Sequence, residues 1–259
     1  MKFLLTNDDG YNAQGIILLR DKLLKYGDVT IVAPFEHMSA KSASITLGDW
    51  LKVEKIDNHT YAVHGTPTDC TSLALAGLNI DCDVVVSGCN NGHNLSYDVI
   101  LSGTIGACLG AATFRKKTVA FSAPYDDFTC LIEHFDEIWE YINKYNLLSE
   151  EYVLNVNLPR GPYKGIALAR LFYRKDRYYY DQKGNEYYAL SSSNVFVNCT
   201  ALLMEKESSL VDTVAYLYLE FSFCQYCFIN ENILSSIGSI AFNLSLIILK
   251  LSLTLWFFK

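Results

Sequence analysis

The stretch LLTNDDGYNAQG, residues 4–15, decides the fold, because an apolar run ends there in two adjacent acids and a glycine. The run predicts a buried strand over Lys2–Thr6, and apolar residues at helical spacing predict a helix over Gln14–Lys25. A second strand is predicted over Val29–Ala33. Strand, helix and strand in this order form a βαβ unit, whose two strands lie parallel.

The same alternation of strands and helices continues to Pro159. Further helices are predicted over Cys70–Ala76, Thr104–Ala112 and Phe128–Lys144, and further strands over Ser44–Leu47, Leu51–Lys55, Thr60–Val63, Asp83–Ser87, Thr118–Ser122 and Val153–Val156. Strands that alternate with helices predict an α/β fold, in which a mostly parallel sheet is flanked by helices.

The composition excludes several classes of protein. Of the 259 residues, 51% are hydrophobic, which is enough for a sizeable core. The formal net charge is −7 and no run of Lys or Arg is long enough to make a basic surface for nucleic acid, so we expect no binding of nucleic acid. We expect no secretory signal before the first strand, and the eight cysteines should therefore be free thiols in a reducing cytoplasm.

Two segments after the predicted sheet differ from it in composition. Tyrosines among charges and turn residues, including Lys183-Gly184-Asn185, predict hairpin-like arms between Gly165 and Val197. The segment Ile233–Phe258 contains a single charged residue, Lys250. Its length and polarity fit a membrane-spanning tail, whereas its serines and asparagine favour a buried helix or a chain end that encodes no regular fold.

Polar loops follow the predicted strands, where ligands of open parallel sheets bind. The loops are Thr6–Gly10, Glu36–Ser42, Ser87–Asn94 and Ser102–Thr104. They offer carboxylate, hydroxyl and amide oxygens, the donors that Mg²⁺ and Mn²⁺ prefer. A cation between Asp8 and Asp9 would offset the repulsion of the two carboxylates. The last loop opens a helix and offers its backbone N–H groups to an anion.

Each of these motifs also has an ordinary structural explanation. Asp-Asp-Gly is usually a turn, and Ser-Gly-Thr is usually a helix cap. Together, a cation and an anion cradle are the minimum needed to hydrolyse a phosphate ester. A nicotinamide-dependent dehydrogenase is a rival on the same architecture, but an acidic pair stands where its Gly-x-Gly-x-x-Gly turn would follow the first strand.

The order of the motifs resembles that of a known family. LLTNDDGYNAQGI, IVAPFEHMSAKSASITL, YAVHGTPTDC, VVVSGCNNGHNLSYDVILSGTIGA and LNVNLP, between Met1 and Pro159, resemble the survival protein SurE family of 5'/3'-nucleotidases. The resemblance implies a Rossmann-like fold, one divalent cation (Mg²⁺ or Mn²⁺), and hydrolysis of nucleoside monophosphates to nucleoside and phosphate. It also implies a homodimer or homotetramer with intersubunit contacts through the arms.

The resemblance assigns roles to individual positions. The implied metal ligands are Asp8, Asp9, Ser39 and Asn90. Our own hypothesis is that Asp8 and Asp9 are also catalytic and that one of the two, with Asp8 as our choice, accepts the proton of the attacking water. The implied phosphate-binding residues are Asn94, Ser102, Gly103 and Thr104, and the implied supporting residues are Asn7, Gly10, Thr66 and Asp69.

The chain departs from the family pattern at several positions. Ala40 replaces a glycine beside Ser39, Cys89 replaces an apolar residue before Asn90, and nothing after Ala215 resembles the family. A shifted reading frame or a membrane anchor would explain this last change. We therefore divide the chain into a metallophosphatase core (1–160), hairpin arms used in oligomerisation (161–215) and an atypical apolar tail (216–259). The alternative function is a non-catalytic nucleotide-binding or membrane-tethered protein, disabled by its altered C-terminus.

Overall fold

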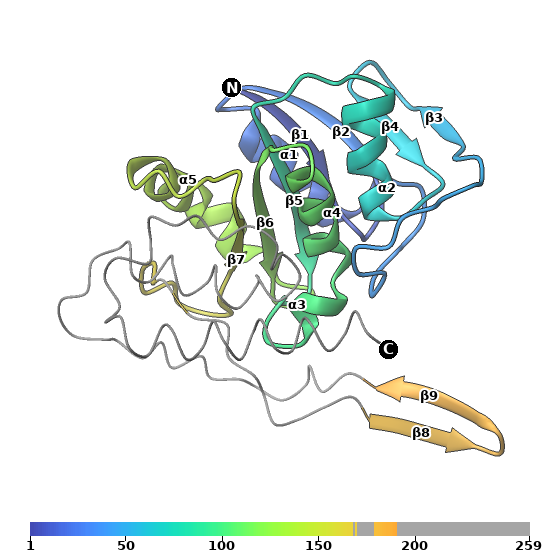
Figure 1. The fold of residues 1–259 in the computed structure, drawn as a ribbon. Coiled ribbons are helices and arrows are strands. Elements are labelled where there is room, and N and C mark those ends of the chain that lie inside the picture. Colours follow the sequence, from blue (N-terminus) through green and yellow to red (C-terminus); the bar gives the residue numbers. More distant parts are fainter. Residues whose placement is uncertain (168, 170–178, 191–259) are drawn as a thin grey trace, which may run out of the picture. The chain divides into compact units, whose positions relative to one another are not determined.

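A single seven-stranded sheet organises the computed structural model, which describes residues 1–167, 169 and 179–190 (Figure 1). The strand order is β3-β4-β2-β1-β5-β6-β7, and every neighbouring pair is parallel except β3–β4. The strands are β1 (Lys2–Thr6), β2 (Asp28–Pro34), β3 (Val53–Lys55), β4 (Thr60–Val63), β5 (Val84–Asn91), β6 (Lys117–Ala123) and β7 (Val153–Asn157). The prediction of a mostly parallel α/β sheet is confirmed.

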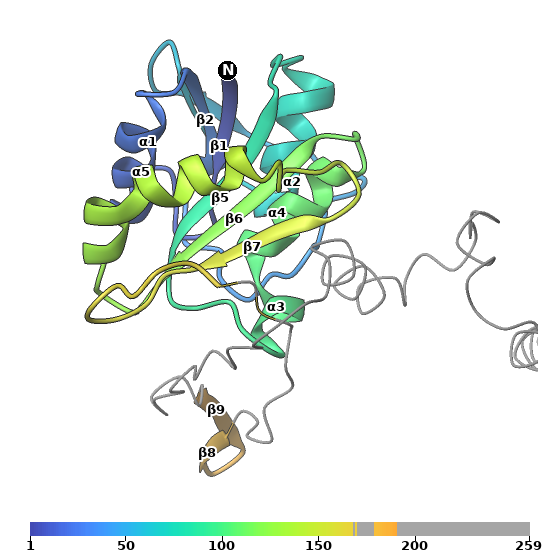
Figure 2. The same ribbon diagram turned by 90° about the vertical axis from the view of Figure 1, so that its left-hand side faces the viewer.

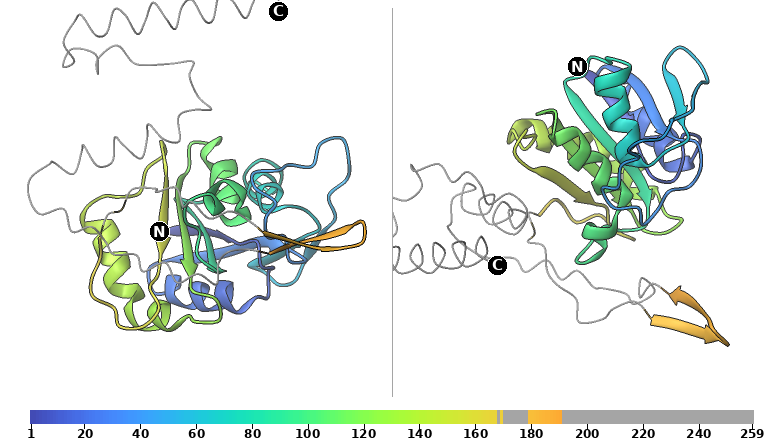
Figure 3. Two further views of the ribbon diagram at one scale, coloured as in Figure 1. Left: turned by 90° about the horizontal axis from the view of Figure 1, so that it is seen from below. Right: turned by 45° about the vertical axis from the view of Figure 1, so that its right-hand side comes forward.

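Helices cover both faces of this sheet. Figures 2 and 3 show α1 (Gln14–Leu23) and α5 (Thr129–Lys144) on one face, and α2 (Pro67–Ser72) and α4 (Gly103–Ala112) on the other. A π-helical turn, Leu73–Gly77, continues α2, and the short helix α3 (Asp98–Leu101) lies beyond the carboxyl end of β5. The predicted flanking of the sheet by helices is therefore also confirmed.

The central strands are apolar on both faces because both faces are covered. In β1, Phe3 and Leu5 pack in the core cluster that includes α1 and α5, whereas Leu4 packs in the cluster that includes α2. The Phe3 ring meets the Trp139 ring of α5 edge-on at 5.6 Å. Burial of these side chains fixes the position of β1 between the two layers of helices. It therefore also fixes the position of the acidic pair that follows β1.

The chain changes direction between β1 and β5. From β1 it proceeds to β2 and β4 on one side, and it then crosses to β5, β6 and β7 on the other. Such a topological switch point leaves a crevice outside the carboxyl ends of the two strands, where open α/β sheets bind their ligands. The motif Asp8-Asp9 follows β1 at this point, and Asn90 lies near the end of β5.

The predicted strand Ser44–Leu47 is wrong, and α2 begins earlier than predicted. The carboxylate of Asp69 accepts hydrogen bonds from the Thr46 backbone N–H and hydroxyl, so this segment bonds to a helix rather than to a strand. Thr66 and Asp69 also form a capping box, with Pro67 in the first turn. This cap starts the helix before the apolar residues that predicted it from Cys70.

The loop predicted over Ser87–Asn94 is partly strand. β5 continues to Asn91, with a shift of register against β6 between Ser87 and Asn90. An irregularity of this kind turns side chains to new directions at the end of a strand. Asn90 therefore stands on a strand end that is bonded to β6.

One hairpin of the predicted arms lies among the described residues. β8 (Tyr179–Lys183) pairs antiparallel with β9 (Glu186–Leu190), and Gly184 in the turn has a φ of 60°. Residues 168, 170–178 and 191–215 of the arms, and the tail, 216–259, lie outside the described residues, so the domain boundaries and the alternatives for the tail stay predictions. Within the described part of the chain, no helix is both long and apolar enough to cross a membrane.

Substitutions at two neighbouring residues of α5, Leu131 and Ile132, would test which side of this helix faces the core. Leu131 is 0% exposed and Ile132 is 47% exposed. We expect Leu131→Ala to lower the free energy of unfolding by about 2–5 kcal/mol, because it leaves a cavity. Ile132→Ala should change it by less than about 0.5 kcal/mol. Urea denaturation of the two variants measures the difference, and equal losses would contradict this placement of α5.

Candidate functional site

Asp8 is the most buried carboxylate at the switch point. It is 2% exposed, and its Oδ1 accepts a 2.6 Å hydrogen bond from the hydroxyl of Thr104 on α4. Its Oδ2 lies 3.4 Å from the Ser39 hydroxyl, and its backbone carbonyl accepts a 2.7 Å bond from the Met38 N–H. The structure therefore brings together the implied ligands Asp8 and Ser39 and the implied phosphate-binding residue Thr104.

The charge on Asp8 is poorly compensated by the protein. Burial, and then the neighbouring carboxylate of Asp9, raise the pKa of Asp8 to about 6, although the bond from Thr104 lowers it. A carboxylate with a raised pKa gains affinity for any cation that replaces the missing counter-charge. The electrostatics of the site thus favour a bound positive charge.

Asp9 is held from β5 and from the loop after β2. Its Oδ2 accepts a 3.0 Å hydrogen bond from the Asn91 N–H, and its Oδ1 lies 3.4 Å from Nδ1 of His37. Neither His37 nor Asn91 was among the site residues predicted from the sequence. The sequence signal that could have identified them is their position near the implied ligands: His37 is two residues before Ser39, and Asn91 follows Asn90.

The turn that presents the two acids is closed by Asn7. The buried Asn7 side chain donates to the Gly10 carbonyl at 2.8 Å and accepts from the Gly10 N–H at 3.2 Å. Gly10 has a φ of 112°, which a residue with a Cβ rarely adopts. Both implied supporting residues therefore fix the backbone on either side of Asp8 and Asp9.

The loop that carries Ser39 packs directly on α3 and α4. Ser42 donates its N–H to the Leu101 carbonyl at 3.0 Å and its hydroxyl to the Ile100 carbonyl at 2.7 Å. A Cβ on Gly106 would lie 2.0 Å from the Ser42 carbonyl oxygen, and one on Gly103 would lie 2.8 Å from Cβ of Asp8. Only glycine at these two positions lets the helix approach the loop and the acidic pair so closely.

The donor set suits a hard divalent cation. The NH₂ group of Asn90 donates to the Gly92 carbonyl at 2.7 Å, which leaves the amide oxygen as the atom to bind a cation. Among the described residues, no three His, Cys, Asp or Glu side chains gather as they do in a zinc site. Besides the carboxylates of Asp8 and Asp9, the loops here offer hydroxyl and amide oxygens, which are donors of the kind that suit Mg²⁺ or Mn²⁺.

The other predicted site residues make contacts of different kinds. Ser102 caps α4 by accepting from the Ile105 N–H at 3.1 Å. Asn94 donates to the Ser122 hydroxyl at 2.8 Å and bonds through its backbone to Asn155 and Asn157 of β7. Asn94 is therefore anchored to β6 and β7, whereas Asp8 and Asp9 contact β5, α4 and the loop after β2.

Thr66 and Asp69 support the site from a distance. The Thr66 hydroxyl donates to the Ser44 carbonyl at 2.6 Å, and the buried Asp69 carboxylate binds Thr46. Both residues thus hold the segment that follows Ser42, and their contacts are with this segment rather than with the acidic pair.

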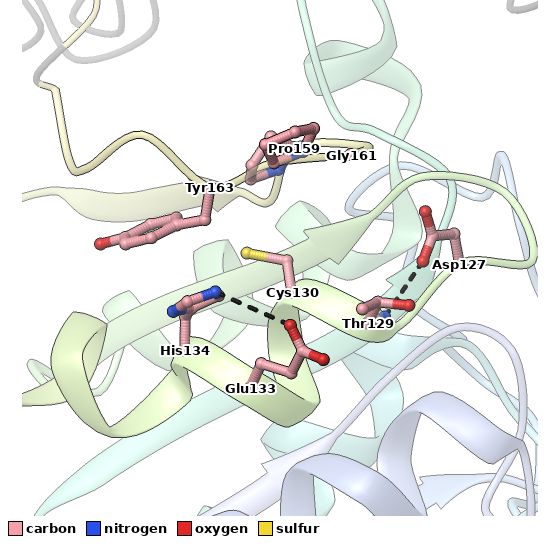
Figure 4. Close-up of a pocket in the computed structure, with 9 residues that line it drawn as sticks. Asp127, Thr129, Cys130, Glu133, His134, Pro159, Gly161 and Tyr163 are labelled. Carbon is pink, nitrogen blue, oxygen red and sulfur yellow. Dashed lines mark hydrogen bonds and ion pairs between the residues drawn. The ribbon is translucent and has the colours of Figure 1, made fainter.

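A separate cavity of about 320 Å³ lies between the start of α5 and the segment after β7 (Figure 4). His134 of α5 stacks on Tyr163 with the ring centroids 4.2 Å apart, and Cys130 lines the cavity beside them. Burial and nearby carboxylates raise the pKa of the Cys130 thiol to about 11, so the thiol stays protonated and unreactive. None of the predicted site residues lines this cavity.

Comparisons with known proteins agree with the fold and with the motifs. Residues 3–178 match the family model of the survival protein SurE. The chain is 42% identical over 183 residues to a 5'-nucleotidase SurE of Mannheimia succiniciproducens, covering 67% of this chain and 72% of that protein. It is 38% identical over 180 residues to a 5'-nucleotidase SurE of Legionella pneumophila, covering 66% and 70%. The crystal structure of the SurE protein from Aquifex aeolicus matches with a TM-score of 0.63 and 33% identity, over 74% of this chain and 83% of that one.

The close approach of α4 to the Ser39 loop predicts the effect of Gly106→Ala. The added methyl group would collide with the Ser42 carbonyl and displace the loop. We expect hydrogen exchange of the Ser42 amide, which bonds to Leu101, to accelerate at least about tenfold. Exchange measured by mass spectrometry checks this.

Gly77→Ala is the matched control. Its Cβ would meet only the end of the flexible Leu73 side chain, at 2.7 Å. Exchange at Ser42 should not change in this variant. An unchanged rate in Gly106→Ala as well would show that the loop does not depend on the glycine.

Proposed function

The chain belongs to the survival protein SurE family, and we propose that it is a 5'-nucleotidase that hydrolyses nucleoside monophosphates with the help of one Mg²⁺ or Mn²⁺. Relatives with 38% and 42% identity are named 5'-nucleotidases, which supports an enzyme of this type. The metal, the mechanism and the site residues rest on the geometry at the switch point.

The observation that carries the proposal is the pair Asp8-Asp9 at the end of β1, with one carboxylate buried and insufficiently compensated. Asp8, Asp9, Ser39 and Asn90 would hold the cation through oxygen atoms. When bound, a divalent cation polarises a phosphoryl oxygen and lowers the pKa of a water molecule.

The amino end of α4 would bind the phosphate. The side chain and the carbonyl of Ser102 accept from the Ile105 and Gly106 N–H groups, so the N–H groups of Gly103 and Thr104 are the ones that the first helical turn leaves for a ligand. Such N–H groups bind anions at helix ends. Gly103 also lies against Asp8, which places this end of α4 beside the acidic pair.

The remaining residues would position the reacting groups. Thr104 donates to Oδ1 of Asp8 and leaves Oδ2, on the side of Ser39, to accept the proton of the attacking water. Asn94, fixed to β6 and β7, would hold the far wall of the phosphate site. Positioning and charge neutralisation account for the chemistry without a covalent intermediate. A cytoplasmic homodimer or homotetramer remains our prediction for the assembly.

Replacing Asp9 by Asn tests the ligand set. The amide keeps the size of the side chain but removes one negative charge, so we expect phosphate release from AMP to fall at least about 100-fold. Asp21→Asn is the control, because Asp21 is exposed and pairs with Arg20 at the surface. Full activity of Asp9→Asn, measured with Mn²⁺ as phosphate released per enzyme, would show that the assignment is wrong.

Removing divalent metal tests the cofactor. We expect EDTA followed by dialysis to abolish phosphate release from AMP, and added Mn²⁺ or Mg²⁺ to restore it. Calorimetry should detect uptake of one ion per chain. Hydrolysis that continues in EDTA would refute metal dependence, and uptake without hydrolysis would favour the non-catalytic alternative.

A further inference from the structure

The residues assigned so far contact the metal and phosphate ends of a nucleotide but leave its base without a partner. Bases commonly bind proteins by stacking on aromatic side chains, which needs no particular hydrogen-bonding pattern. An aromatic ring close to the acidic pair, at the carboxyl edge of the sheet, would supply such a partner.

Three rings meet at this edge, from the ends of three neighbouring strands. Tyr11 follows β1, Phe35 follows β2 and His64 follows β4. Phe35 stacks on His64 with centroids 4.3 Å apart and planes 18° apart, and Tyr11 lies 5.8 Å from Phe35. All three residues are half-buried, so the cluster retains accessible surface. We call it the Tyr11–Phe35–His64 cluster.

The cluster is close to the acidic pair. Tyr11 is two residues after Asp9, so their Cα atoms are at most about 7.6 Å apart. Phe35 is two residues before His37, whose Nδ1 lies 3.4 Å from Asp9. The Tyr11 N–H bonds to the Pro34 carbonyl at 2.9 Å, which ties the β1 and β2 members of the cluster together.

The cluster is also held rigidly. Phe35 donates its N–H to the Val63 carbonyl at 2.8 Å, and the His64 ring bonds through Nε2 to the Glu54 carboxylate at 2.9 Å. Lys52, and then His64, lower the pKa of Glu54, so its carboxylate stays ionised and keeps hold of the ring. Groups fixed before binding lose little entropy when a ligand arrives.

The order of the strands sets the order of the binding groups. Along the edge, the cluster lies at the ends of β4, β2 and β1, and the acidic pair lies between β1 and β5, where Thr104 of α4 contacts Asp8. A nucleotide has the same linear order of base, ribose and phosphate. With its phosphate at the acidic pair and α4, its base would extend toward β2 and β4.

We propose that the Tyr11–Phe35–His64 cluster binds the base of the substrate by stacking, and so makes nucleoside monophosphates better substrates than phosphate esters that lack a base. This inference rests on the proposed function and adds a binding site for the base to it. Both purines and pyrimidines can stack on the cluster. A purine should bind more tightly, because its ring system is larger.

The test compares AMP with ribose 5-phosphate, which has the same phosphate and sugar but no base. In the unmodified full chain with Mn²⁺, we expect a higher kcat/KM for AMP. Phe35→Leu should lower kcat/KM for AMP about tenfold and leave that for ribose 5-phosphate within about twofold, because only AMP loses stacking. Phe35→Tyr keeps a ring and should retain the preference for AMP.

Tyr145→Leu is the matched control, since Tyr145 belongs to another ring pair, with Tyr141 on α5, and is 41% exposed. This variant should leave kcat/KM unchanged for both AMP and ribose 5-phosphate. Adenosine binding by calorimetry gives a readout without turnover, and its Kd should rise about tenfold in Phe35→Leu.

Different failures have different meanings. The stacking proposal would be overturned if Phe35→Leu lowered kcat/KM equally for AMP and ribose 5-phosphate. It would also be overturned if the Kd for adenosine were unchanged in this variant. Lack of preference for AMP in the unmodified protein would overturn it as well. Lack of hydrolysis of either ester, with adenosine binding still weakened in Phe35→Leu, would instead refute the proposed nucleotidase activity.

Discussion

The buried carboxylate of Asp8 is the point on which the site depends. Its Oδ1 takes the Thr104 hydroxyl from α4, its Oδ2 faces Ser39, and its carbonyl takes the Met38 N–H. Two segments that are distant in sequence, the loop after β2 and the start of α4, therefore converge on one residue at the end of β1. A buried charge is costly unless polar groups or a cation compensate it, so the fold brings these groups together at the place where it needs them.

Close backbone contacts make that convergence rigid. A Cβ on Gly15 would lie 2.0 Å from the Cys89 carbonyl oxygen, and one on Gly106 equally close to that of Ser42. The first contact sets α1 against β5, and the second sets α4 against the Ser39 loop. Sites of this type need their donors held to within a fraction of an ångström, and backbone packed on backbone has little freedom to move. The short glycine-containing motifs thus act through packing as much as through turns.

Much of this arrangement is readable from the sequence, because periodicity and chain order are local signals. The βαβ start, the central strands and the place of Asp8-Asp9 follow from such signals, and the fold agrees with them. The failures concern contacts between distant segments. Ser44–Leu47 has the composition of a strand, but Thr46 bonds to the Asp69 carboxylate instead of to a neighbouring strand. The extension of β5 past Ser87 depends on its pairing with β6.

The contact of His37 with Asp9 also joins distant segments, so the position of His37 near Ser39 in the sequence was only an indirect signal for it. Its ring approaches Asp9 only because the loop after β2 folds back over the end of β1. The rings of Phe35 and His64, 29 positions apart in the chain, stack because β2 and β4 are parallel neighbours that end at the same edge. A parallel sheet thus gathers side chains that no sequence pattern connects, and the strand order decides which lie next to the acidic pair. In this chain the aromatic rings lie at the ends of β1, β2 and β4. They neighbour oxygen donors at the ends of β1 and β5 and in the loop after β2, and this arrangement matches a ligand with a charged phosphate at one end and a planar base at the other.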